Sequence, residues 1–244
     1  MHHLVLERWS RGASGLHRRD PRAKSLAVLA LLLTLATAWR GVPLLAMMLL
    51  AMLLVGLLWA RIPVRAALLR SGLVFSFTVP FALISVIAGE PLRAASLLLK
   101  SYVSSLAVLL LVATTPVALL LRGLESSGFP RFLLMVAQFV YRYLFVISEE
   151  AQHLRAAALG RGGWTQGALG RGAGFRAAAG AVGALFSRSY GRAAEIHRAM
   201  LARGFGGRFP FLGGLRWTAA DSLFVLAAAS APVFARFVAE RLAA

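Results

Sequence analysis

Two arginines stand in small-Arg-Gly endings, each at the end of an alanine-rich segment. The first lies in Gly160-Arg161-Gly162 and the second in Ala202-Arg203-Gly204. Glycine ends a helix and small neighbours allow close approach, so each guanidinium is expected at an exposed helix tip. A guanidinium placed there can form several charge-assisted hydrogen bonds with another protein. The chemistry predicted for this pair is therefore docking, without bond making or breaking.

A simpler interpretation is that each arginine only complements the dipole of an ordinary helix C-terminus. One such ending would favour that interpretation. The pattern occurs twice in one segment, after Glu149-Glu150 in the first case and after Glu195 in the second. This repetition favours a pair of docking tips that contact a partner protein.

The sequence lacks the motifs of an enzyme or a primary pump. Gly160-Arg161-Gly162-Gly163 has no Lys-Ser/Thr of a phosphate-binding loop, and no HExxH sequence or Ser-His-Asp spacing occurs. The apolar segments are also poor in polar groups at mid-depth, where a secondary carrier keeps ionisable residues or broken helices. We therefore predict that the chain is not an enzyme, binds no cofactor or metal of its own and leaves the substrate to another subunit.

The composition indicates an integral membrane protein. Of 244 residues, 59% are hydrophobic, and residues 42–60 form an apolar run close to the length of a bilayer-spanning helix. The formal charge is +18, almost all of it from arginine. The basic stretch at residues 160–176 has no aromatic ladder or groove-reading motif beside it, which argues against nucleic acid as a partner. The predicted surroundings are a lipid bilayer.

The predicted fold is all-α, with about five transmembrane helices. The spans are residues 25–39, 44–60, 66–88, 93–113 and 217–238. The segment between the fourth and fifth spans is too long for a plain loop. It contains a short helix from residue 117 to 128 and two long helices, at about 130–159 and 175–202, which look like helices in or under the headgroup layer. The chain divides into residues 1–113, an interfacial module at 114–216 and a last span in 217–244.

Arginine is concentrated in three segments: the N-terminus, the connection between the second and third spans, and the module at 114–216. With five spans all three lie on one side of the membrane, and basic segments remain in the cytoplasm. The N-terminus and the module are therefore predicted to be cytoplasmic. At the start of the last span, Thr218 and Asp221 have capping-box spacing, so Asp221 is expected to cap the helix rather than bind an ion.

Three motifs make the sequence resemble the transmembrane T component of energy-coupling-factor transporters. That family carries a pair of Ala-Arg-Gly motifs on cytoplasmic coupling helices; Ala202-Arg203-Gly204 matches the second, and Gly160-Arg161-Gly162 has glycine in place of the first alanine. Residues 17–24, His-Arg-Arg-Asp-Pro-Arg-Ala-Lys, are similar to the family's entry into the first span. Residues 141–146, followed by Glu149-Glu150, are similar to the cobalt-transport, CbiQ-type branch.

The resemblance implies a coupling mechanism. Two cytosolic ABC-type ATPases hydrolyse ATP with Mg²⁺, and each accepts one coupling helix in a groove. The six residues of the two motifs would form the docking sites: Gly160, Arg161, Gly162, Ala202, Arg203 and Gly204. Their movement would reorient a separate CbiM-like membrane subunit that holds the transported Co²⁺, and the resemblance also allows a small accessory membrane subunit. The implied location is the bacterial cytoplasmic (inner) membrane.

Three alternatives remain open at the level of the sequence. The same architecture could serve nickel or a vitamin, because no residue here identifies the cargo. The chain could instead be a stand-alone secondary carrier, or a membrane scaffold unrelated to transport. A T component should co-purify with an ATPase, whereas a carrier should transport when it is alone in liposomes.

Overall fold

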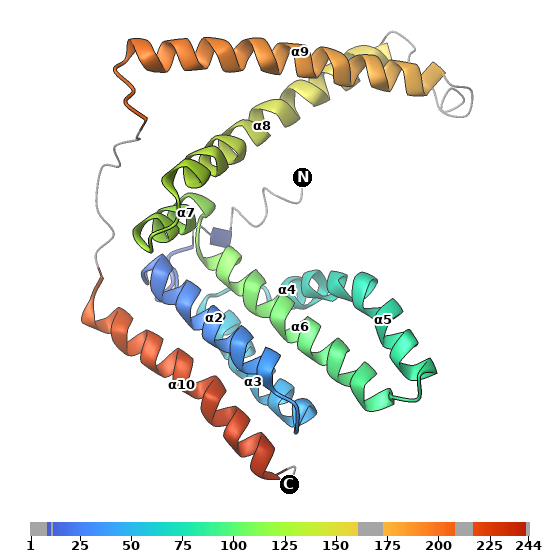
Figure 1. Ribbon diagram of the computed structural model, residues 1–244, viewed down its shortest axis with the longest axis vertical. Helices are drawn as coiled ribbons and strands as arrows, with labels where there is room; N and C mark the ends of the chain where they lie inside the picture. The colour runs from blue at the N-terminus through green and yellow to red at the C-terminus, as the bar shows by residue number, and fades with distance from the viewer. Residues whose placement is uncertain (1–8, 11, 161–172, 208–216, 243–244) are drawn as a thin grey trace. The chain divides into compact units, whose positions relative to one another are not determined.

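The computed structural model describes residues 9–10, 12–160, 173–207 and 217–242, and every regular element within them is helical (Figure 1). The all-α prediction is confirmed. The chain forms two compact units: a bundle unit, Met1–Gly128 with Gly214–Ala244, and an α8–α9 unit, Phe129–Gly213.

The bundle unit contains most of the helices. They are α2 (Pro21–Thr37), α3 (Val42–Trp59), α4 (Val64–Ser71), α5 (Phe75–Ile87), α6 (Pro91–Thr114), α7 (Val117–Ser126) and α10 (Ala219–Leu242). Within this unit α2 packs against α10, α6 and α7, while α3 packs against α6 and α10 (Figure 1). On its other side α6 packs against α5. Helices α2 and α6 are thus the central elements on which the others assemble.

Helix ends in the bundle unit follow from local sequence. The Asp20 carboxylate accepts a hydrogen bond from the Arg22 N–H at 2.8 Å, and Pro21 occupies the first turn, so α2 has a strong start. Helix α6 stops before Thr115, which is extended with φ −141° and ψ 118°. The cause is Pro116, because proline disfavours helical backbone in the residue before it.

The core of the bundle unit is almost entirely leucine and alanine. Leu35, Leu45 and Leu106 are at most 1% exposed. At the turn between α2 and α3, Gly41 has a φ of 62°, and a Cβ built on it would lie 2.5 Å from the Ala239 carbonyl oxygen. Glycine is therefore needed at this turn both for its backbone conformation and for the close approach of α10.

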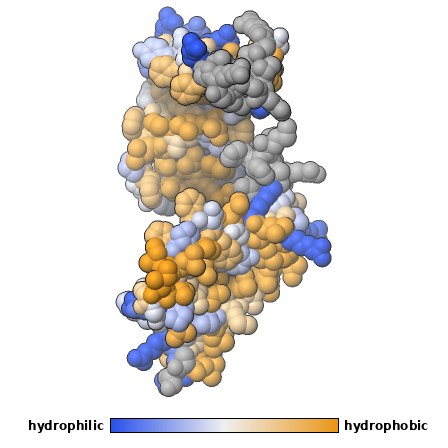
Figure 2. Space-filling view, turned by 90° about the vertical axis from the view of Figure 1, so that its right-hand side faces the viewer, coloured by the Kyte–Doolittle hydropathy of each residue, from blue (hydrophilic) through white to orange (hydrophobic). Residues whose placement is uncertain are grey.

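The outer surface of the bundle unit is also hydrophobic. Phe77 and Ile87 of α5 are 78% and 85% exposed, and hydrophobic residues cover much of this unit's visible face in the lower part of Figure 2. A water-soluble protein rarely exposes so large an apolar area. This surface is suited to contact with lipid.

Five helices among the described residues are long and apolar enough to cross a membrane: Val42–Trp59, Val64–Ile87, Pro91–Thr114, Arg131–Gly160 and Ala219–Leu242. The predicted number agrees, but the set differs. Helix α2, predicted as the first span, has 17 residues and rises only about 25 Å, less than a hydrocarbon core of about 30 Å. Helix α8 was predicted to lie at the membrane surface. It is nevertheless long and apolar enough to cross a membrane, because its first half is apolar.

The predicted third span is not one regular helix. A 3₁₀ turn at Gly72–Val74 separates α4 from α5, and Figure 1 shows the change of direction between them. Glycine is the weakest helix former after proline, which explains the position of the break.

The α8–α9 unit consists of α8 (Arg131–Gly160) and α9 (Ala173–Ala202), each 30 residues long, which contact each other. Their bounds agree closely with the two long helices predicted from the sequence. The glycine-rich turn predicted at residues 160–167 lies, apart from Gly160, outside the described residues.

Candidate functional site

The end of α9 is built as a complete Schellman motif. The Gly204 N–H donates to the Leu201 carbonyl at 2.9 Å, and the Phe205 N–H donates to the Met200 carbonyl at 3.0 Å. These two bonds require a left-handed residue between them, and Gly204 has a φ of 77°. The motif satisfies the last carbonyls of α9 and turns the chain sharply directly after Arg203.

Arg203 is the last residue before that turn, and its side chain is exposed. Ala202 and Gly204 on either side are exposed as well, so small residues border the guanidinium. Among the described residues no carboxylate forms an ion pair with Arg203. The position near the negative end of the α9 dipole favours a cation there. The structure thus presents a guanidinium with free hydrogen-bonding capacity at a helix tip.

The first arginine motif lies at the end of α8. Gly160 is the last residue of that helix and is exposed, whereas Arg161 and Gly162 lie outside the described residues. A Cβ built on Gly160 meets no atom within 4 Å, so alanine would fit here without a clash. Alanine is the residue that the Ala-Arg-Gly motif of the similar T components has at this position. The docking role of all six motif residues stays a prediction.

An ion pair and an apolar cavity lie where α8 and α9 meet. The Arg188 guanidinium of α9 donates to the Glu150 carboxylate of α8 at 2.5 Å. Near the pair lies a cavity of about 500 Å³, with Tyr143 and Leu144 on α8 and Ile196 on α9 among its lining residues. The sequence indicated Glu149-Glu150 as a motif but gave no sign of its partner, because Arg188 follows 38 residues later.

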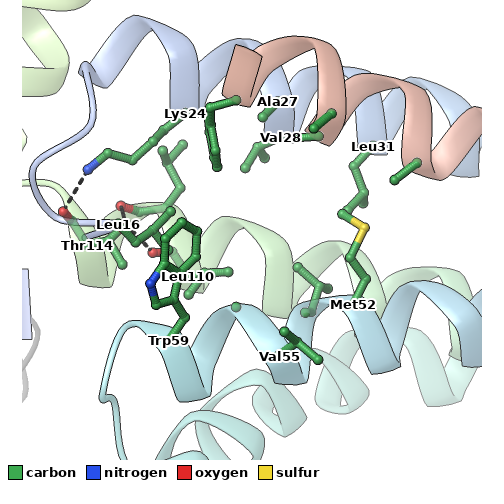
Figure 3. Close-up of a pocket in the computed structure, with 17 residues that line it drawn as sticks. Leu16, Lys24, Ala27, Val28, Leu31, Met52, Val55, Trp59, Leu110 and Thr114 are labelled. Carbon is green, nitrogen blue, oxygen red and sulfur yellow. Dashed lines mark hydrogen bonds between the residues drawn. The ribbon is translucent and has the colours of Figure 1, made fainter. Parts of the chain in front are cut away.

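The Asp-Pro-Arg-Ala-Lys segment at the start of α2 forms an internal cluster rather than a surface site. Lys24 is 4% exposed. Its ammonium donates to the Thr115 hydroxyl at 2.8 Å and to the Thr114 carbonyl at 3.0 Å, which ties α2 to the end of α6 (Figure 3). A buried lysine is stable only when its donors are satisfied in this way. This motif therefore holds helices together.

The α10 helix joins the same cluster through Asp221. Its carboxylate accepts from the Thr218 N–H at 3.0 Å and the Thr218 hydroxyl at 2.6 Å, as the predicted cap requires. The other carboxylate oxygen accepts from the Asp20 N–H at 3.3 Å and lies 3.8 Å from the Arg19 guanidinium. Asp221 thus caps α10 and also fixes it beside the start of α2, a second role that the sequence did not reveal.

The motifs of α2 and α9 lie within one stretch that matches a known family. Residues 12–211 match the family model described as CbiQ, cobalt transport protein. The chain belongs to the CbiQ family. The matched range contains Lys24 with Thr114 and Thr115, both arginine motifs and helices α8 and α9, whereas α10 with Asp221 follows it.

A curated CbiQ relative supports the same assignment. The cobalt transport protein CbiQ of Rhodobacter capsulatus is 29% identical over 210 residues, which cover 82% of this chain and 84% of the relative. Together with the apolar helices, membership of the CbiQ family makes the chain a multi-pass membrane protein of cobalt transport.

A metal site would need several His, Asp or Glu side chains close together in the described part of the chain. No group of three His, Asp or Glu side chains there is arranged to hold a metal ion. His17, the histidine of the entry motif, bonds instead to the Ser14 hydroxyl at 2.6 Å and donates from Nε2 to the Trp9 carbonyl at 2.9 Å. Its contacts are structural and shape the chain before α2.

Proposed function

We propose that this chain is the coupling subunit of an ATP-driven, energy-coupling-factor importer of cobalt ions. The observation that carries the proposal is the tip of α9, where a Schellman motif exposes Arg203 between two small residues. In this role the chain is not catalytic. Two cytosolic ABC-type ATPases bind and hydrolyse ATP, and one docks at each arginine motif.

Transmission of force needs stiff elements between the motors and the membrane. Helices α8 and α9 have 30 residues each, and the Arg188–Glu150 ion pair joins them. An axial push on either tip is then shared between the two helices instead of bending one of them. The movement reorients a separate CbiM-like membrane subunit that holds Co²⁺, and a small accessory membrane subunit completes the importer.

The arrangement of charges supports a cytoplasmic position for the docking tips. The arginine-rich segments around residues 8–24, 61–70 and 122–216 fall on one side of the bilayer when the five segments predicted from the sequence cross it, with α2 as the first span and α8 outside the hydrocarbon core. The N-terminus and the α8–α9 unit then lie in the cytoplasm of a bacterial cell, and the bundle unit lies in its inner membrane. In that position α8 lies at the membrane surface.

Co-purification tests the proposal directly. The tagged chain, expressed with the other proteins of its transport system, should retain a nucleotide-binding ATPase through affinity and size-exclusion chromatography. The chain alone in liposomes should not take up Co²⁺. Uptake by the isolated chain, or purification without any ATPase under these conditions, would contradict the proposed role.

Gly204 offers a milder test of the helix tip. Gly204→Ala places a side chain at a φ of 77°, which costs about 1–2 kcal/mol and misdirects Arg203, although the new Cβ meets no atom within 4 Å. We expect ATPase affinity to fall by roughly tenfold, the free-energy equivalent of that cost. Gly206→Ala is the matched control, because Gly206 is equally open and its φ lies outside the left-handed range. If the two changes lower ATPase co-purification equally, the left-handed turn at Gly204 does not position Arg203 for binding.

A further inference from the structure

Two neighbouring cavities of the bundle unit have opposite chemical character. The first, of about 360 Å³, lies between α2, α3, α6 and α10 and is almost entirely apolar. Figure 3 shows Met52, Val55 and Trp59 of α3 on one side of it and Val28 and Leu31 of α2 on the other. Val55 is 66% exposed, so the cavity opens at the lipid-facing surface.

The second cavity, of about 510 Å³, lies where α3 ends. Ser14, His17, Arg18 and Arg61 are among its lining residues, and about half of its surface is polar. Trp59 lines both cavities. The indole packs over Gly15, where an added Cβ would lie 3.3 Å from the ring. Trp59 thus borders both an apolar cavity within the membrane and a basic one at the membrane boundary, where tryptophan is typically found.

The two cations of the second cavity are available to a ligand. The Arg18 and Arg61 side chains are exposed, and within the described residues neither forms an ion pair. The Lys24 ammonium lies at the border of the apolar cavity. In contrast to the two arginines, it donates hydrogen bonds to the Thr114 carbonyl and the Thr115 hydroxyl. A ligand at this place would meet two guanidinium groups that form no ion pair with the described residues.

Arg61 occupies a backbone position that favours glycine. Its N–H donates to the Leu58 carbonyl at 3.0 Å and the Ile62 N–H donates to the Leu57 carbonyl at 3.1 Å, which makes a Schellman motif at the end of α3. Arg61 has a φ of 55°, and it is the one residue other than glycine with positive φ among those described. A strained arginine kept where glycine would fit points to a use for its side chain.

We propose that the two cavities together hold one anionic phospholipid. One acyl chain occupies the apolar cavity, and the phosphate lies beside Arg18 and Arg61 in the basic one. The charge and polarity of the two cavities match the two parts of such a lipid, and their junction at Trp59 lies at the end of a membrane-spanning helix. This inference is independent of the proposed coupling role.

Native mass spectrometry of the purified full-length chain tests the proposal. Dioleoyl phosphatidylglycerol is the anionic probe, and dioleoyl phosphatidylcholine, glycerol phosphate and inorganic phosphate are the comparison arms. We expect one tightly retained phosphatidylglycerol, preferred over phosphatidylcholine by roughly tenfold or more, because each interfacial arginine contributes about a fivefold preference for anionic lipid. The two soluble phosphates should not compete at equal concentration, since they lack the acyl chain.

Arg61→Gly and Arg18→Gln separate lipid binding from folding. Arg61→Gly relieves the strained backbone and should leave the chain as stable as before or more so, yet it should lower the preference for phosphatidylglycerol. Together the two changes should remove that preference. Arg65→Gln is the control, because Arg65 follows the same helix end but does not line the cavity.

Ala228→Leu should fill the apolar cavity and weaken retention of both lipids. Ala229→Leu, the control on the same helix, lies outside that cavity and should have no effect. Equal retention of both lipids by the native chain, or displacement by phosphate alone, overturns the proposal. So does cross-linking of a Val55→Cys variant to another membrane subunit when no lipid is retained, because a protein would then fill the cavity.

Discussion

Arg203→Glu should abolish stable association with the ATPase and, with it, ATP-driven uptake. The guanidinium is exposed at the tip of α9 and forms no ion pair with the described residues, so its bonds are available to a partner. Losing one member of a buried charge pair costs about 2–5 kcal/mol, which is at least roughly a thirtyfold loss of affinity. Reversal adds repulsion at the same place. Quantitative pull-down of the ATPase measures the effect.

Three variants separate docking from general charge effects. Arg198→Glu changes the net charge equally on another face of α9 and should leave association nearly intact. Arg203→Lys keeps the charge but loses the planar fork, so an intermediate loss is expected. Since Arg203 is exposed, thermal stability should stay within about 0.5 kcal/mol of the original. Arg161→Glu combined with Arg203→Glu should leave no assembly; survival of assembly in this double variant would refute docking.

Lys24→Met should destabilise the bundle unit strongly without touching the docking tips. Lys24 joins α2 to the end of α6 through Thr114 and Thr115. Its removal leaves the Thr115 hydroxyl and the Thr114 carbonyl without these bonds and removes a cation that interacts electrostatically with Asp20 and Asp221. We expect a loss of about 3–5 kcal/mol in the free energy of unfolding, measured by thermal denaturation in detergent.

Lys100→Met is the matched control. Lys100 is half-buried and donates one hydrogen bond, to the Ala38 carbonyl at 2.7 Å. Its loss should cost about 1 kcal/mol, the usual net contribution of a single hydrogen bond. If Lys24→Met proves no more destabilising than Lys100→Met, the Lys24 cluster does not hold the helices together. At temperatures where Lys24→Met is folded, association with the ATPase should persist.

Local sequence predicted the helices and several of their ends, because those depend on neighbouring residues. Gly204 ends α9 where it was expected, since the left-handed turn needs glycine. Asp221 caps α10 through Thr218, three residues away. Helix α6 ends at Thr114, one residue after the predicted end of the fourth span. The bounds of α8 and α9 were predicted in the same way, from the proline and glycine residues that start or end a helix.

The partners of the helices could not be predicted in this way. Leu33 is 57% exposed and Leu35 is 1% exposed, although both are leucines on one apolar helix. In a membrane the lipid-facing side is as apolar as the core, so no hydrophobic stripe marks the packed face. The contacts of Lys24 with Thr115 and of Asp20 with Asp221 join residues 91 and 201 positions apart.

The break in the third span was also missed, and the first helix ends two residues before its predicted end. Gly72 stands in an apolar run, where one glycine is compatible with either a continuous or a broken helix. Helix α2 ends at Thr37, before the predicted Trp39, because Ala38 is already extended. For the docking motifs, the sequence provided the residue types, and the structure adds the geometry of the second tip.

Site-specific cross-linking at the α9 tip tests the coupling role most directly. The chain has no cysteine, so Ala202→Cys introduces a unique attachment point for a photoreactive label beside Arg203. In membranes that contain the whole transport system, the label should form an adduct with the nucleotide-binding ATPase, while a label at Ala95→Cys on α6 should not. An Ala202→Cys label that reacts with lipid, and never with an ATPase, would contradict the account.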